Sequence, residues 1–402
     1  MSAALQCVAR RLCTPLAVLA ACLAPAASAG VELEVIALDG RAVRGQLSAL
    51  APDLVLFTEG GEATLAWSDV LAVQTGRAID PKLFAGTAEP LRFELADGSR
   101  FAGSIVEGGE REFVVRVLDG QTGRLRASLV QRVVSAAAPE ELHRKLATEA
   151  LDSSEDVLLA MREGQSVVLR GAVKRIEPER VVFAWRGREL PLSWGLVVGA
   201  AFAQAAPRGA ACLVRLADAQ VFAGRVVGGD EQTVRLRSSA FENLALPWSH
   251  IARIDCHSER LTYLSDLRPA MYEFEPYFRK RWDYAGDVSL SGGPIRLGGR
   301  TYAKGICTKS RALLVYRLDG RYRQFAATVG ILDEMGPRGD VTAAVLGDGR
   351  PLWEMRNVRG GQAPRDLLVD VAGVEELGLL VDYGEDLDLS DHVAWGLARL
   401  IR

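Results

Sequence analysis

Four stretches of this sequence repeat one pattern, and the repetition restricts the kind of fold the chain can adopt. Each stretch begins with a strand of alternating apolar and polar residues that ends at a short acidic turn. A second strand with an internal glycine follows, and an apolar strand closes the stretch. The turns are Asp39-Gly40, Asp97-Gly98, Glu163-Gly164 and Asp218-Ala219; the strand glycines are Gly45, Gly103, Gly171 and Gly224, at spacings of 58, 68 and 53 residues. Tryptophan beside serine recurs in three closing strands, at Trp67-Ser68, Ser193-Trp194 and Trp248-Ser249.

An Asp-Gly pair between alternating strands is a strong β-hairpin signal, because both turn positions tolerate a positive φ. The alternation of Val31, Leu33 and Val35 is typical of a strand with one buried face. Each copy has room for about four or five short strands, which predicts a small SH3-like or Sm-like barrel or a half-sandwich. A unit of this size buries little surface, so we expect neighbouring copies to pack together.

The copies fall into two groups along the chain. We expect a first pair of β units at residues 30–138 and a second pair at 153–258, separated by a helical connector at 139–152. The connector begins with proline, has acidic residues in its first turn and continues with alanine, leucine and lysine, as helices do. The chain is 402 residues long, which exceeds what one hydrophobic core usually supports, so a further domain at 259–402 is expected.

The N-terminal 29 residues resemble an export signal. They contain Arg10, Arg11 and no acid, then an apolar run too short to span a bilayer, then the small-residue exit Ala27-Ser28-Ala29. Residues 1–29 are therefore predicted to be a signal peptide, and the protein to be exported to the periplasm, the cell envelope or the medium. Two cleavage sites compete: one after Ala29, and one before Cys22, whose lipidation would attach the protein to a membrane.

Charge and composition exclude several classes of protein. Apolar residues make up 49% and charged residues 25% of the chain, so it is not largely disordered. The formal charge is −3, and loss of residues 1–29 would make it −5. This charge argues against a protein that binds nucleic acid through its phosphates, so no nucleic-acid partner is expected.

Three cysteines remain once the signal is removed: Cys212, Cys256 and Cys307. An odd number leaves at least one thiol free or paired between chains. Cys212 and Cys256 flank the fourth β unit and could form a disulfide in an oxidising compartment. Three separate buried thiols are the alternative, because cysteine often behaves as a small core residue.

The last third of the chain contains a different set of segments. They are Lys304-Gly305, Thr328-Val329-Gly330-Ile331, Gly347-Asp348-Gly349, Val369-Asp370-Val371-Ala372-Gly373 and Asp391-His392 followed by Trp395. Their order over roughly 261–402 closely resembles the NPCBM/NEW2 family, carbohydrate-binding modules often found on bacterial glycoside hydrolases. The resemblance implies a galactose-binding-like jelly roll that binds sugars at loops on one rim. Short apolar runs separated by glycine-rich or acidic turns independently predict an antiparallel sandwich, so the predicted fold class is all-β throughout.

This copy departs from the family pattern near its end, at Ala394-Trp395 and Gly396, and in the segment after Lys304-Gly305. Cys307 stands where the family usually has glycine, and Lys309 stands where it usually has histidine. A lysine can donate a hydrogen bond to a hydroxyl but cannot accept one.

Sugar recognition needs an apolar face for ring C–H groups and convergent donors and acceptors for hydroxyls. The residues predicted to supply them are Tyr302, Lys304, Thr308, Lys309, Asp333, Glu334, Asp391 and His392. Tyr302 is equally suited to a core position or a binding platform. For His392 the simpler interpretation is a buried packing partner of Trp395 in the closing strand.

The acidic stretch 385–391 offers enough oxygen ligands for Ca²⁺, with Asp386, Asp388 and Asp391 as the candidate ligands. It lacks the EF-hand spacing, and a solvated acidic turn is the alternative interpretation. No other cofactor is expected. The sequence contains no G-x-S-x-G, H-E-x-x-H or phosphate-binding loop motif, and its four histidines form no ligand-spaced set, so catalysis is not expected.

Together these features predict an exported, non-catalytic protein that binds a carbohydrate or glycoconjugate through its C-terminal jelly roll. Two alternatives remain open. The first is a structural or protein-interaction module of the cell envelope without sugar binding, whose partners are envelope proteins. The second is an accessory subunit of a glycoside hydrolase.

Overall fold

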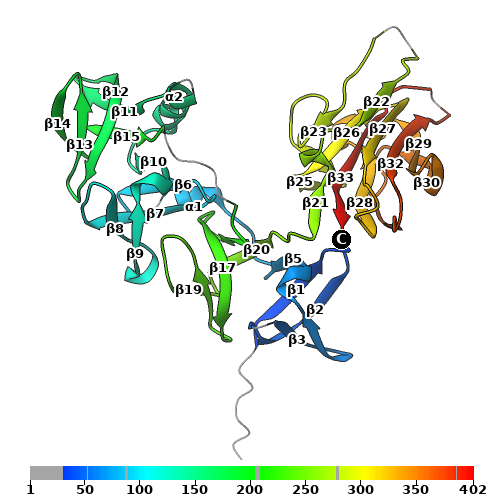
Figure 1. Cartoon of the computed structure of the whole chain (residues 1–402), viewed down its shortest axis with the longest axis horizontal. Helices are drawn as coiled ribbons and strands as arrows, with labels where there is room; N and C mark the ends of the chain where they lie inside the picture. The colour runs from blue at the N-terminus through cyan, green and yellow to red at the C-terminus, as the bar shows by residue number, and fades with distance from the viewer. Residues whose placement is uncertain are drawn as a thin grey trace, which may run out of the picture. The chain divides into compact units, whose positions relative to one another are not determined.

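A computed structural model describes residues 30–402, except 52, 87–88, 152, 204–208, 278–279 and 386. The predicted signal peptide, with Cys22, therefore lies outside the described residues. The prediction of an all-β chain is confirmed: the described part has 33 strands and two α-helices (Figure 1). No helix in this part of the chain is both long enough and apolar enough to span a membrane.

Residues 32–256 form four β units of five strands each. The first two units comprise β1 (Glu32–Ala37), β2 (Ala42–Ala49), β3 (Leu54–Thr58), β4 (Gly61–Leu65) and β5 (Val70–Gln74), then β6 (Leu91–Leu95), β7 (Arg100–Glu107), β8 (Glu112–Arg116), β9 (Thr122–Arg126) and β10 (Val130–Ser135). The last two comprise β11 (Asp156–Arg162), β12 (Gln165–Ile176), β13 (Arg180–Trp185), β14 (Arg188–Ser193) and β15 (Val197–Ala201), then β16 (Cys212–Leu216), β17 (Val221–Gly229), β18 (Thr233–Arg237), β19 (Leu244–Pro247) and β20 (Ile251–Cys256). In every unit the first strand pairs with both the second and the fifth.

The turns between the first and second strands differ from the prediction of two residues with positive φ. In three units only the residue after the aspartate has a positive φ: Gly40 (93°), Gly98 (93°) and Ala219 (67°). In each of these turns the aspartate carboxylate instead accepts a hydrogen bond from the backbone N–H two residues on, as from Arg41 to Asp39 at 2.9 Å. Only Glu163-Gly164 has the expected pair of positive φ angles, 51° and 80°.

Each second strand bends at an irregularity in its pairing with the third strand, shortly after the recurring glycine. The glycines allow two strands to approach closely where the bend begins. A Cβ atom would lie 2.4 Å from the Phe57 carbonyl oxygen at Gly45, 2.4 Å from that of Arg116 at Gly103, 2.1 Å from that of Ala184 at Gly171 and 2.5 Å from that of Arg237 at Gly224. The recurring tryptophans hydrogen-bond to the end of the bent strand. The indole N–H groups of Trp67, Trp194 and Trp248 donate to the backbone oxygens of Leu50, Glu177 and Asp230, each of which directly follows the second strand of its unit.

Strand pairing between units differs from the expected division into a first and a second pair. β5 of the first unit pairs with β20 of the fourth, and β10 of the second pairs with β15 of the third. A single bridge also joins β7 to β17. The free edge strand of each unit thus finds a partner that is not always its neighbour in sequence. Helix α2 (Glu140–Leu151) packs Leu146 among Val134, Val157 and Val198, within the joined second and third units.

Two cysteines of the fourth unit face each other. Cys212 and Cys256 are directly opposite on β16 and β20, with their sulfur atoms 3.5 Å apart. Both are buried free thiols, as is Cys307 in the C-terminal domain.

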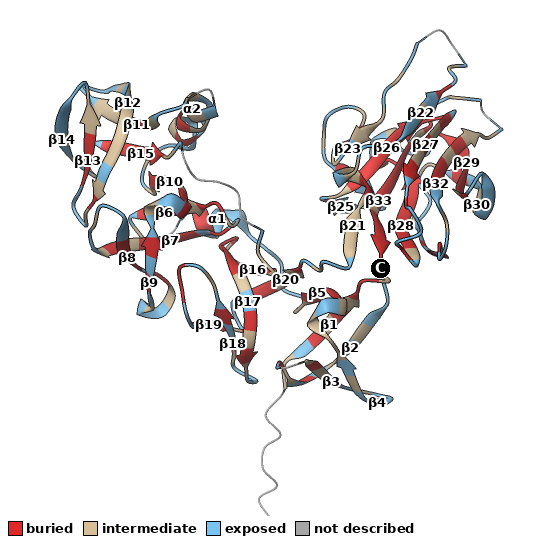
Figure 2. Ribbon diagram, in the orientation of Figure 1, coloured by how far each residue is buried: buried red, intermediate tan, exposed pale blue. Residues whose placement is uncertain are grey.

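Residues 261–401 form a two-layer sandwich of antiparallel strands. Its strands are β21 (Leu261–Tyr263), β22 (Met271–Phe274), β23 (Ala285–Gly286), β24 (Ile295–Leu297), β25 (Arg300–Tyr302), β26 (Gly305–Lys309), β27 (Ala312–Arg317), β28 (Gln324–Ile331), β29 (Asp340–Gly347), β30 (Arg350–Arg359), β31 (Arg365–Asp370), β32 (Glu376–Tyr383) and β33 (His392–Ile401). One sheet has the order β23-β26-β33-β28-β31, with β21 beside β33, and the other has the order β22-β27-β32-β29-β30. The core between them includes fully buried Trp395, Tyr316 and Phe325, and Figure 2 shows the burial along β28 and β33.

Candidate functional site

The pairing of β26 with β33 places two of the predicted site residues side by side. Lys309, the last residue of β26, is the register partner of His392, the first residue of β33. This end of the sheet also receives the segment 280–282 and the short 3₁₀ helix η5 (Asp333–Met335), which follows β28 directly. We call this edge of the sandwich the rim.

Four side chains meet at the rim, and we call Lys280, Trp282, Glu334 and His392 the rim cluster. The indole of Trp282 lies edge-on to the His392 imidazole, with ring centroids 5.3 Å apart and planes at 63°. The Lys280 ammonium lies 3.8 Å from the centre of the Trp282 ring, as a cation–π contact. Glu334 Oε1 is 3.9 Å from His392 Nδ1, while its Oε2 accepts a hydrogen bond of 2.6 Å from the Ser291 hydroxyl.

The His392 imidazole is largely neutral at pH 7. Burial lowers its pKa below 6.5, and the Lys309 ammonium lowers it further, whereas the Glu334 carboxylate acts in the opposite direction. Its Nδ1 atom is shielded from solvent and has no hydrogen-bond partner among the described residues. A buried polar atom without a partner is costly, and such atoms often mark a place where a ligand or an ordered water binds.

Lys309 lies beneath the rim cluster and is itself only 8% exposed. Its ammonium donates to the Asp388 backbone oxygen and lies 3.5 Å from the Asp388 carboxylate, so its charge is neutralised within the loop before β33. The neighbouring Thr308 is fully buried, and its hydroxyl has no partner among the described residues. The structure therefore gives Lys309 and Thr308 supporting positions rather than exposed ones.

Two predicted acidic residues hold loops in place. Asp333 accepts backbone hydrogen bonds from Gly298 and Gly299, at 2.7 and 2.8 Å. Asp391 is fully buried and accepts from the Ser310 hydroxyl and from the Asp340 backbone N–H. Both carboxylates thus stabilise the backbone beside the rim.

The proposed calcium ligands are not gathered in the described structure. Asp388 pairs with Lys309, and Asp391 points into the domain; Asp386 lies outside the described residues. Among the residues that are described, no group of three or more histidine, cysteine or acidic side chains is arranged to hold a metal ion.

Two predicted sugar contacts lie away from the rim cluster. Lys304 precedes β26 and Lys309 ends it, so about 16 Å of strand separates them. Lys304 forms ion pairs with Asp266 and Asp287. Tyr302 is only 7% exposed, and its ring covers Gly396, where a Cβ atom would lie 2.7 Å from it. Tyr302 is thus a core residue and not a platform, because the β24–β25 hairpin folds it onto β33.

Sequence reasoning missed Lys280, Trp282 and Ser291 as site residues. Trp282 belongs to an aromatic-rich stretch at 272–284, but nothing local in the sequence distinguishes it from Tyr272 or Tyr284, whose rings pack together 5.2 Å apart. The available signal was a basic residue two positions before a tryptophan, because a lysine and an indole at this spacing are compatible with a half-buried binding platform.

A family model and several known proteins match parts of this chain. The NPCBM/NEW2 domain model matches residues 260–401. A 90-residue segment is 32% identical to a Renibacterium salmoninarum protein named as an endo-alpha-N-acetylgalactosaminidase; it spans 22% of this chain and only 6% of that protein. Among solved structures, the CBM51 module of Clostridium perfringens GH95, in complex with methyl-galactose, is 28% identical with a TM-score of 0.32, covering 35% of this chain and 99% of that one. The CBM51-2 and INT domains of Clostridium perfringens ZmpB, with GlcNAc bound to CBM51-2, are 26% identical with a TM-score of 0.33, covering 42% of this chain and 36% of that one. Residues 260–401, which contain the rim and both sheets of the sandwich, match the NPCBM/NEW2 domain model.

Proposed function

We propose that this protein is an exported, non-catalytic module that binds a neutral glycan at the rim cluster of its NPCBM/NEW2 domain. One observation supports the position of the site above others: a buried, unpartnered imidazole nitrogen lies between a tryptophan ring and a carboxylate. The family match supports carbohydrate as the ligand class.

A sugar hydroxyl fits the space between His392 and Glu334. A hydroxyl has one proton and two acceptor lone pairs, so it can donate to the Glu334 carboxylate and accept from the imidazole in the tautomer that carries its proton on Nδ1. The two protein atoms are 3.9 Å apart, and one oxygen at about 2.8 Å from each would satisfy both. This contact would satisfy the Nδ1 atom that the protein leaves without a partner.

The Trp282 indole would cover the apolar face of the sugar ring beside that hydroxyl. Lys280 is exposed and now occupies a position over the indole, so a sugar would displace its ammonium toward a neighbouring hydroxyl. Such a contact exchanges a cation–π interaction for a stacking contact and a charged hydrogen bond.

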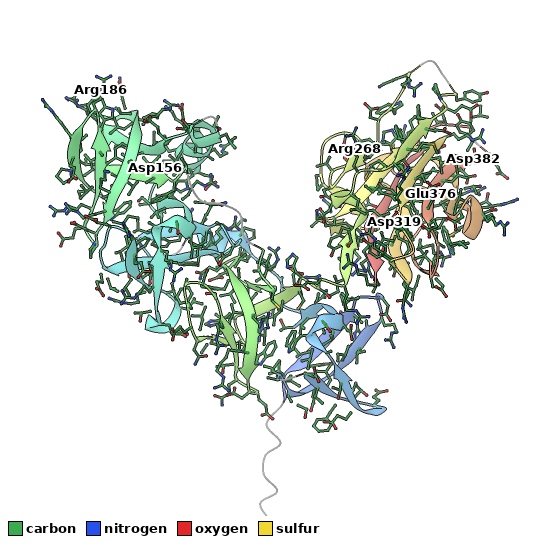
Figure 3. All side chains as sticks on the ribbon, in the orientation of Figure 1. Asp156, Arg186, Arg268, Asp319, Glu376 and Asp382 are labelled. Carbon is green, nitrogen blue, oxygen red and sulfur yellow. The ribbon has the colours of Figure 1, made fainter. Side chains whose placement is uncertain are left out.

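Calorimetric titration of the full chain with methyl-galactoside and with GlcNAc tests the proposal. Trp282→Ala and His392→Ala should each weaken binding about tenfold or more, because each removes a contact of about 1.5 kcal/mol or more. Trp185→Ala is the matched control, because the Arg186 guanidinium lies 4.6 Å from the centre of the Trp185 ring, as Lys280 lies over Trp282. Arg186 is labelled in Figure 3, in the third β unit, and Trp185 is far from the rim cluster in sequence. Equal losses in Trp282→Ala and Trp185→Ala, or no binding of either sugar, would reject the rim as the site.

Export and the envelope alternative need separate measurements. Mass spectrometry of the mature N-terminus distinguishes cleavage after Ala29 from lipidation at Cys22. If the chain retains envelope proteins in the presence of saturating sugar, and Trp282→Ala leaves this unchanged, a protein-interaction role replaces the glycan role.

A further inference from the structure

A hollow that shares no residue with the rim lies in the β units. It encloses about 460 Å³, within the range of small-molecule sites. Its walls come from helix α1 (Pro81–Ala85), strands β6, β7 and β10, and helix α2, with Ala219 of the fourth unit closing one side. These walls supply four arginines, Arg92, Arg100, Arg132 and Arg144, against two glutamates, Glu94 and Glu140. The lining therefore has a formal charge of +2, although the whole chain is acidic.

The excess positive charge is concentrated on three of the four arginines. Arg132 is neutralised, because its guanidinium donates two hydrogen bonds to Glu94. Among the described residues, neither Arg100 nor Arg144 forms an ion pair. The Arg100 guanidinium lies 5.4 Å from the centre of the Phe84 ring, and that of Arg92 lies 5.2 Å from the same ring. Phe84 thus holds two cationic groups at one wall of the hollow.

Arg92 is buried without full compensation. The residue is 9% exposed, and its Nη2 atom donates to the backbone oxygens of Ala85 at 2.9 Å and of Ala136 at 3.4 Å. Its Nε atom is shielded and has no partner among the described residues, and its nearest acidic atom, Glu140 Oε2, is 3.9 Å from Nη1. A buried guanidinium is normally paired with a carboxylate or phosphate at closer range.

Glu140 marks the place that an external anion would take. Its carboxylate lies between Arg92, at 3.9 Å, and His143 Nδ1, at 3.4 Å, and its side chain is 73% exposed. His143 Nε2 donates to the Ser135 backbone oxygen at 2.9 Å, and this bond orients the ring so that Nδ1 faces the Glu140 carboxylate. Because Glu140 is solvent-exposed and makes only long contacts, an incoming oxyanion can displace it at small cost.

We propose that this hollow binds a small organic molecule, about the size of a monosaccharide, through a phosphate, sulfate or carboxylate group. The oxyanion lies between Arg92 and His143 in place of the Glu140 carboxylate, with Arg144 and Arg100 at the opening. The planar guanidinium of Arg92 matches the paired oxygens of such a group. This site is independent of glycan binding at the rim.

Calorimetric titration of the full chain with glucose 6-phosphate, glucuronate and glucose tests the proposal, with inorganic phosphate as the minimal anion. All titrations are repeated in the Trp282→Ala background, so that sugar binding at the rim does not contribute. Glucose 6-phosphate or glucuronate should bind at least tenfold more tightly than glucose, and binding should weaken with added salt. If neither charged sugar binds more tightly than glucose, the proposal is wrong.

Variants locate the anion within the hollow. The double variant Arg100→Gln/Arg144→Gln should weaken binding about tenfold, because it removes two exposed positive charges that attract the anion. Arg124→Gln, an exposed arginine outside the hollow, should leave it unchanged. Glu140→Gln should strengthen binding about threefold by removing the competing carboxylate, a gain that a misfolded variant would not show. Equal losses in Arg124→Gln and the double variant, or weaker binding in Glu140→Gln, would overturn the proposal.

Discussion

The recurring glycine of each β unit can be tested by adding one methyl group. At Gly45, Gly103, Gly171 and Gly224 an added Cβ would lie 2.1 to 2.5 Å from a backbone oxygen of the third strand. Such contacts do not occur below 3.0 Å, so the two strands would have to separate by about 0.5 to 0.9 Å. The obstacle is backbone, which cannot rotate away as a flexible side chain can.

Gly103→Ala should therefore destabilise the second unit by about 2 to 3 kcal/mol, the upper part of the range for overpacked sites. Because a chain of several units need not unfold in one step, global denaturation is a poor measure, and hydrogen exchange read at the amides of β7 and β8 is preferable. Those amides should exchange about 30- to 140-fold faster than in the wild type. Gly60→Ala is the matched control, since its nearest atom would be Thr58 Oγ1 at 3.8 Å. Wild-type exchange in Gly103→Ala would show that the close approach does not shape the unit.

Three further predictions concern side chains with defined environments. Oxidation with diamide should link Cys212 to Cys256, because their sulfur atoms are 3.5 Å apart and the hydrogen bond between them lowers the pKa of the Cys212 thiol. Burial raises the pKa of the Cys307 thiol to about 12, so Cys307 should resist alkylation in the native protein. Peptide mapping identifies the linked cysteines, and a disulfide that includes Cys307 would contradict both expectations. Asp391→Ala should destabilise the sandwich by about 2 to 3 kcal/mol, because it leaves the Ser310 hydroxyl and the Asp340 N–H unpaired. Thermal unfolding measures the loss, with Asp283→Ala at an exposed position of the same domain as the control; equal losses in the two variants would contradict the prediction. The pKa of His392 in the folded protein is below its unfolded value of 6.5, so the unfolded chain takes up more protons on acidification. Stability and sugar binding should therefore be constant above pH 6.5 and fall below it. If His392→Gln shows the same pH profile as the wild type, this residue is not the cause.

Much of the fold could be predicted because it depends on local sequence. The acidic turns, the strand alternation and the helix at 140–151 are encoded within a few residues each. The short apolar runs that predicted the antiparallel sandwich coincide with β27, β28, β29, β31, β32 and β33. The turn geometry was less predictable, because Asp39, Asp97 and Asp218 can either adopt a positive φ or cap the next N–H, and the structure uses the second option.

The pairing between units could not be predicted, because it depends on which edges meet once each unit has folded. β5 and β20 lie about 180 residues apart in sequence, yet Arg253 and Gln74 are register partners. The candidate site could be predicted only in part, because one of its residues comes from a segment distant in sequence. His392 and Glu334 follow from the family-like segments, but Trp282 reaches them from a loop whose course the strand pattern does not specify.

The lysine at position 309 changes the interpretation of this family-like site. Considered alone, it replaces a side chain that can accept a hydrogen bond with one that cannot. The structure shows that its ammonium is directed to Asp388, and that its cross-strand partner is His392. From there the lysine acts through its charge: together with burial, it lowers the pKa of His392 and favours a neutral ring. A neutral imidazole has one donor and one acceptor nitrogen, whereas a protonated ring only donates. Burial and the Lys309 charge thus keep the ring at position 392, the cross-strand partner of Lys309, in the neutral form that retains one acceptor nitrogen.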